Sequence, residues 1–168
     1  MTKTNPPKME PLKQWICDTC HGLIRCPEDG YVEWLHGEDP PYNVRGFRIV
    51  HHAPASPRKP DGDCYLYTKH AGRNDLDLKG FVGPLGLVRL LSFIDVGPYH
   101  QREYGTHRVD DLRGWTEVFR RLHLPYYEEA RLHWYKALED GYFDGCNEVW
   151  LYMPETLKTL IERYGADT

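Results

Sequence analysis

Two cysteines separated by two residues, Cys17 and Cys20, constrain the fold of this chain more than any other feature. This spacing lets two thiolates point at one metal ion while nearby backbone amides donate hydrogen bonds to the sulfur atoms. The residues that follow are predicted to form short extended segments. Such segments bury too little apolar surface to be stable without a cross-link such as a bound metal. The pattern therefore predicts a small β module held together by a metal.

A tetrahedral zinc site needs two further nitrogen or sulfur donors. The sequence offers histidines at the end of one predicted strand and a cysteine at the start of the next. We therefore expect zinc to be bound by three thiolates and one imidazole, from Cys17, Cys20, His51 and Cys64. Four protein ligands leave no open position for substrate, so this zinc is expected to stabilise the fold rather than to perform catalysis.

The histidine ligand is one of two neighbours, His51 and His52. Side chains alternate between the two faces of a strand, so His51 shares a face with Phe47 and Ile49. That face is the more apolar one, which favours His51 as the buried ligand. His52 remains an alternative because the following Ala-Pro sequence can bend the strand, and Cys26 is an alternative to either later ligand.

The five cysteines are Cys17, Cys20, Cys26, Cys64 and Cys146. An odd number, with no N-terminal apolar run typical of a signal peptide or membrane anchor, favours metal ligands and free thiols over disulfides. We therefore expect a cytoplasmic protein that does not enter a membrane.

The chain divides into a flexible N-terminal segment (1–13), a metal-binding β module (14–72) and a mainly helical region (73–168) that forms one compact unit with the module. Strands are predicted in the β module at 31–35, 47–52 and 65–68. Apolar periodicity and Pro or Gly boundaries predict helices at 83–94, 110–124, 125–141 and 154–165, the second capped by Asp110, with a lone strand at 148–152. The predicted fold class is α+β, an antiparallel β module packed with a bundle of about four helices.

Residues 15–67 resemble zinc-ribbon modules in their knuckle cysteines and short strands. The likeness is general and names no specific family. Because the four-ligand site leaves no position for substrate, the leading interpretation is a small zinc-binding interaction or regulatory module with a protein partner, rather than an enzyme.

A second interpretation rests on residues 47–54, which resemble the strand end that carries the catalytic histidine of HNH-type nucleases. That resemblance implies a metal-dependent nuclease in which His51 or His52 activates water. Asn74 and His70 would complete the site, in an order and spacing that differ from the family's pattern. Separately, residues 17–21 spell the Cys-x-x-Cys-His pattern of covalent haem attachment.

The formal net charge of −4 disfavours nucleic-acid binding, which needs a concentrated basic surface. A non-catalytic DNA-binding regulator is nevertheless a third interpretation. The adjacent Arg120 and Arg121 are expected to lie on a solvated helix face. Glu129 and His133, four residues apart, are expected to form a surface pair on the third helix.

Overall fold

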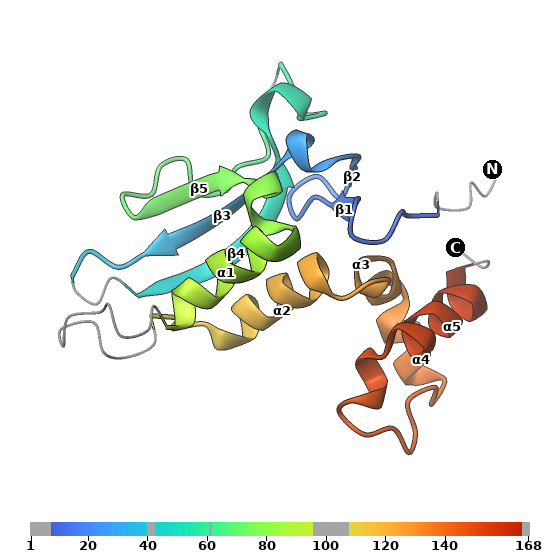
Figure 1. Cartoon of the computed structure of the whole chain (residues 1–168). Coiled ribbons are helices and arrows are strands. Elements are labelled where there is room, and N and C mark those ends of the chain that lie inside the picture. The colour runs from blue at the N-terminus through green and yellow to red at the C-terminus, as the bar shows by residue number, and fades with distance from the viewer. Residues whose placement is uncertain (1–7, 40–42, 61, 96–107, 166–168) are drawn as a thin grey trace.

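The computed structural model describes residues 8–39, 43–60, 62–95 and 108–165. A two-stranded hairpin and a three-stranded antiparallel sheet occupy the first half, and helices dominate the second half (Figure 1). The predicted α+β class is confirmed. Of the segment 1–13 that was predicted to be flexible, the structure describes residues 8–13, here called the N-terminal strap, in which Met9 is buried. Residues 1–7 lie outside the described residues.

The three-stranded sheet has the order β4-β3-β5, with β3 (Gly30–His36) in the centre, β4 (Val44–His51) on one side and β5 (Arg73–Asp77) on the other. The first two strands agree with the predicted ones at 31–35 and 47–52. Strand β5 was not predicted, because its polar residues lack the apolar alternation typical of a half-buried strand.

The strand predicted at 65–68 is wrong. This segment crosses the sheet as a loop, in which the amide of Leu66 donates to the carboxylate of Glu33 at 3.1 Å. Glu33 is fully buried on β3 and also receives a hydrogen bond from Arg48 at 3.0 Å. A buried carboxylate needs such donors, so the segment satisfies a side chain rather than a neighbouring strand.

Two helices cover one face of the sheet, α1 (Gly83–Ile94) and α2 (Leu112–His123) (Figure 1). Both agree with the prediction. The predicted N-cap of α2 is wrong, because Asp111 rather than Asp110 accepts the hydrogen bond from the amide of Gly114, at 2.8 Å. Their inward side chains pack on the sheet with Trp34, Phe47 and Phe93 in mutual aromatic contact.

The remaining elements lie beyond the end of α2 and form a helical unit with its own small core (Figure 1). Its elements are α3 (Tyr127–Ala130), a 3₁₀ turn (Arg131–His133), α4 (Trp134–Glu139), a second 3₁₀ turn (Trp150–Tyr152) and α5 (Pro154–Tyr164). The helix predicted at 125–141 is therefore interrupted. The strand predicted at 148–152 is wrong, because the side chain of Asn147 accepts the amides of Val149 and Trp150 and closes a turn. The helices thus fall into two groups rather than one bundle.

In the part of the chain that the structure describes, no helix combines the length and the apolar character needed to cross a membrane.

Candidate metal centre

The first part of the centre is a knuckle, residues 15–24, in which β1 (Trp15–Ile16) pairs with β2 (Leu23–Ile24). The turn between them is closed by the amide of Cys17, which donates to the carbonyl of Gly22 at 2.9 Å. The amides of Thr19 and Gly22 donate to the sulfur atoms of Cys17 and Cys20, at 3.5 and 3.4 Å. Amide hydrogen bonds of this kind stabilise thiolate charge, which is what the two-residue spacing predicts.

The knuckle is fixed to the sheet through Asp18, which lies between the two knuckle cysteines. Its amide donates to the carbonyl of Ile49 at 2.9 Å, and its carboxylate accepts the amide of Ile49 at 2.7 Å. Because Ile49 precedes His51 by two residues on β4, this pairing brings the histidine to the cysteines.

The ligand atoms of Cys17, Cys20, His51 and Cys64 all lie within 4.8 Å of one another. Bond lengths of about 2.3 Å for Zn–S and 2.0–2.1 Å for Zn–N place tetrahedral S···S pairs about 3.8 Å apart and S···N pairs about 3.6 Å apart. The Nδ1 atom of His51 lies 3.4 Å from the sulfur of Cys20 and 3.9 Å from that of Cys64. These separations suit a single ion among the four donors.

The orientation of His51 is set by its second ring nitrogen. Nε2 lies 3.3 Å from the carbonyl oxygen of Leu23, to which it can only donate. The lone pair then belongs to Nδ1, which faces the three sulfur atoms. Metal-bound histidines are usually held in this way by a backbone carbonyl or a carboxylate.

Cys64 lies on the loop between β4 and β5, and two contacts fix its position. Its carbonyl accepts a hydrogen bond from the hydroxyl of Thr19 at 2.5 Å, and its sulfur lies 3.2 Å from the hydroxyl of Ser56. Sequence reasoning did not identify Ser56, since a lone serine in a proline-rich loop gives no signal.

Burial raises the pKa of the Cys20 thiol, and it raises the pKa of Cys64 to about 12. Without a cation the two thiols therefore stay protonated in the folded protein. A divalent metal would replace these protons, so that binding would release protons and depend on pH.

The alternatives for the fourth ligand lie elsewhere. The His52 ring packs against Tyr31, with ring centroids 4.6 Å apart, and Cys26 is not part of the cluster. In the haem-attachment pattern the histidine after the second cysteine is the metal ligand, whereas here the cysteines converge on His51 and His21 is not part of the cluster. Among the described residues no second group of three or more Cys, His, Asp or Glu side chains has ligand atoms this close together.

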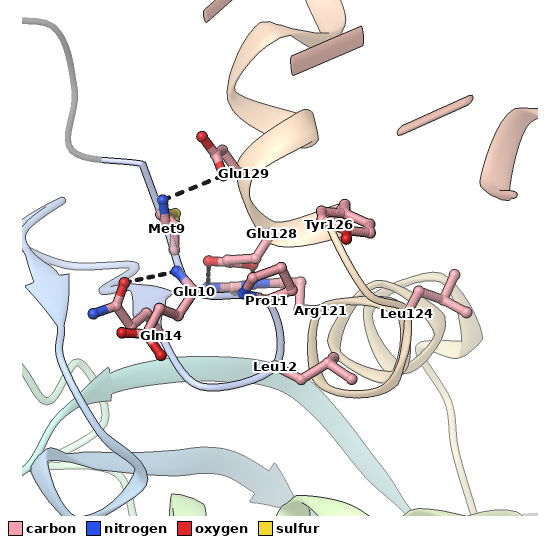
Figure 2. Close-up of a pocket in the computed structure, with 10 residues that line it drawn as sticks. All are labelled: Met9, Glu10, Pro11, Leu12, Gln14, Arg121, Leu124, Tyr126, Glu128 and Glu129. Atoms are coloured by element: carbon pink, nitrogen blue, oxygen red, sulfur yellow. Dashed lines mark hydrogen bonds and ion pairs between the residues drawn. The ribbon is translucent and has the colours of Figure 1, made fainter. Parts of the chain in front are cut away.

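A buried ion-pair network joins the knuckle to the helices. Arg121, only 3% exposed, donates to both carboxylate oxygens of Asp18 at 2.8 Å and to the carboxylate of Glu128 at 2.7 and 3.0 Å. Glu128 also accepts from Arg131 and from the backbone amide of Ile16 at 2.8 Å. Figure 2 shows Arg121 and Glu128 beneath the N-terminal strap. The network consists of Asp18, Arg121, Glu128 and Arg131.

The charges of the network balance, with two carboxylates and two guanidinium groups. Burial by itself would raise the pKa of Glu128, but Arg121 and Arg131 outweigh it and hold that pKa below its usual value. The expectation that Arg121 lies on a solvated face is therefore wrong. Its signal in the sequence was its position three residues after Val118, on the buried side of α2.

Comparisons with protein-family models, with curated proteins and with solved structures found no match to this chain, so the likeness to zinc ribbons is not confirmed by any known fold.

Proposed function

We propose that this chain is a small cytoplasmic zinc protein in which the metal holds the knuckle, the end of β4 and the Cys64 loop together. The observation that carries the proposal is the convergence of three cysteines and one correctly oriented histidine on one point. Three sulfur donors and one nitrogen at tetrahedral spacing favour zinc over magnesium, calcium or copper(II). All five cysteines are free thiols, which agrees with a reducing compartment.

The role proposed for the metal is structural, because the four protein ligands complete the coordination of zinc. Water has no place in such a shell, which removes the basis for the HNH-type interpretation. His52 packs on an aromatic ring and His70 lies in an exposed turn, so neither adjoins the cluster.

Elemental analysis of the purified chain tests the proposal. We expect one zinc per chain, and a cobalt-substituted form with the intense visible absorption of tetrahedral cobalt–thiolate coordination. Cys64→Ser should lose both, whereas Cys26→Ser and Cys146→Ser, which alter cysteines outside the cluster, should keep both. Absence of tightly bound metal from the wild-type chain, or equal metal content in all three variants, would contradict the zinc site.

We further propose that the module serves protein interaction, through the outer face of α1. Leu85 and Val88 are each 63% exposed, Leu91 lies one turn further along the same face, and the less exposed Leu87 lies at its edge. A helix that is apolar all round is normally covered on every side. The helix has no acidic residue, and its one basic side chain, Arg89, lies over the ring of Phe81. The partner surface that fits is therefore an apolar, uncharged patch on another protein.

The matched variants are Leu85→Ser with Val88→Ser on this face, and Leu112→Ser, which removes an equally exposed leucine from α2. A partner that is retained by the wild-type chain and by Leu112→Ser should, after purification, bind the wild-type chain with a negative heat-capacity change and little salt dependence. It should not bind the double variant. Equal binding to all three would contradict the assignment of this face, and self-association of the chain through it would contradict a partner on another protein.

A further inference from the structure

A cavity of about 330 Å³ lies where the knuckle meets α3 and the following 3₁₀ turn. Its walls are mainly apolar and come from three separate segments, through Met9, Ile16, Leu23 and Leu132. The volume is at the lower end of the range for small-molecule sites, about 300–1,000 Å³. The metal centre does not use any of these side chains.

Glu129 supplies a carboxylate to this cavity. One of its oxygens accepts the amide of Met9 at 3.3 Å, a contact that Figure 2 shows between the N-terminal strap and α3. Burial raises the pKa of Glu129, and the amide of Met9 and the charge of Lys8 only partly offset this effect. Unlike its neighbour Glu128, Glu129 forms no ion pair with an arginine in the part of the chain that the structure describes. A cationic ligand would therefore gain from a carboxylate that the protein leaves largely uncompensated.

His133 lines the same cavity and is 6% exposed. No residue that the structure describes hydrogen-bonds to either ring nitrogen, and neither nitrogen is among the buried atoms left without a partner, so the ring is open to a ligand in the cavity or to solvent. Burial lowers its pKa, with a smaller contribution from Lys136, so the ring is neutral and can accept a hydrogen bond. The expected surface pair of Glu129 and His133 is therefore wrong, because the histidine is buried.

The third polar residue that lines the cavity is His21, which follows the second knuckle cysteine and has a positive φ of 57°. Histidine is one of the few residues besides glycine that adopt this conformation readily, and here it closes the knuckle turn, with the amide of His21 donating to the carbonyl of Cys17 at 3.0 Å. The knuckle turn thus contributes an imidazole to the lining of the cavity, together with Glu129 and His133.

We propose that this cavity binds a small amphipathic amine, whose ammonium group pairs with Glu129 and donates to His133 while its aliphatic or aromatic body contacts the apolar walls. An anionic ligand is disfavoured because Glu129 would repel it. A neutral ligand would leave that carboxylate without a counter-charge.

Phenethylamine, 2-phenylethanol and phenylacetate share one body and differ in the charge of the head group. Titration of the zinc-loaded chain with each, followed by two-dimensional NMR, should shift the amides of residues 21, 129 and 133 with the amine most strongly. We expect the amine to bind about tenfold or more tightly than the alcohol, as for one charge-assisted hydrogen bond. No detectable binding of the acid is expected.

Glu129→Gln keeps the shape of the side chain, so it should reduce amine affinity about tenfold and leave the alcohol unchanged. Glu155→Gln, on the exposed first turn of α5, should have no effect. His133→Phe should weaken amine binding and tests the acceptor role separately. Equal affinities for amine and alcohol, or equal amine affinities for the two glutamine variants, would overturn the proposal. Zinc content, measured on the same samples, keeps this outcome distinct from failure of the metal site.

Discussion

The sheet region and the helical unit of this protein are stabilised in different ways. The sheet region has an extended core with fully buried residues from the knuckle, β3, β4, α1 and α2, together with the proposed zinc site. The helical unit has a smaller core in which Leu157 and Leu160 are fully buried, supplemented by stacked aromatic rings such as Trp134 on Tyr152. A small core needs support from its surroundings, so the helical unit is expected to depend on its attachment.

That attachment is the network around Arg121. The guanidinium group lies between Asp18, which belongs to the knuckle, and Glu128, which belongs to α3. Asp18 in turn lies between two proposed metal ligands. The difference between the two regions therefore indicates an order of dependence, in which metal binding fixes the knuckle and the knuckle fixes the helical unit.

Removal of the metal is expected to have the largest effect. Structural zinc contributes about 10–16 kcal/mol in zinc-finger peptides, which is comparable to the total stability of a single domain, about 5–15 kcal/mol. We therefore expect a chelator to unfold the sheet region, with exposure of Trp15, which is completely buried in the folded chain. Circular dichroism measures the loss of secondary structure, and tryptophan fluorescence measures the exposure of tryptophan. A chain that keeps its melting temperature after complete zinc removal would contradict the dependence.

Arg121→Met should destabilise the chain by about 3–5 kcal/mol, because it removes the guanidinium group that pairs with the buried Glu128 and the partly buried Asp18. Urea denaturation measures the loss, and hydrogen exchange shows whether the helical unit opens first. Arg131→Met is the control, since this side chain is 23% exposed and should cost about 1 kcal/mol or less. Equal effects of the two substitutions would show that Arg121 does not attach the helical unit to the knuckle.

Leu160→Ala should cost about 2–5 kcal/mol through the cavity that it creates in the second core. We expect hydrogen exchange to rise in α5 while zinc content stays at the wild-type level. The exposed Leu138→Ala is the control and should have little effect. If Leu160→Ala also released zinc, the proposed order of dependence would have to be reversed.

The smallest expected effect is a pH dependence confined to the helical unit. The folded protein lowers the pKa of His133, so below the ordinary value of 6.5 the unfolded chain takes up a proton that the folded chain does not. Stability should therefore be unaffected above that pH and should fall as the pH drops below it. Hydrogen exchange of α5 amides reports the change, and His133→Gln should remove it. A dependence of the same size in the variant would assign it to other groups.

Much of the candidate site could be read from the sequence because its signals are local. The spacing of Cys17 and Cys20 fixes a knuckle within a few residues, and strand alternation selects His51 over His52. Helices α1 and α2 were likewise predicted from apolar periodicity and from Pro or Gly boundaries, which act over a turn or two of chain.

Only the tertiary structure decided the features that join distant segments. Leu66 turns away from a strand because its amide satisfies Glu33, which is 33 residues earlier, and Arg121 is buried because it meets Asp18 across 103 residues. A charged side chain is predicted to be exposed when its partner is not known, because burial of a charge is tolerated only when the charge is paired. The sequence therefore determined the ligands of the proposed zinc site, whereas long-range pairing of buried charges determined how the rest of the molecule is attached to it.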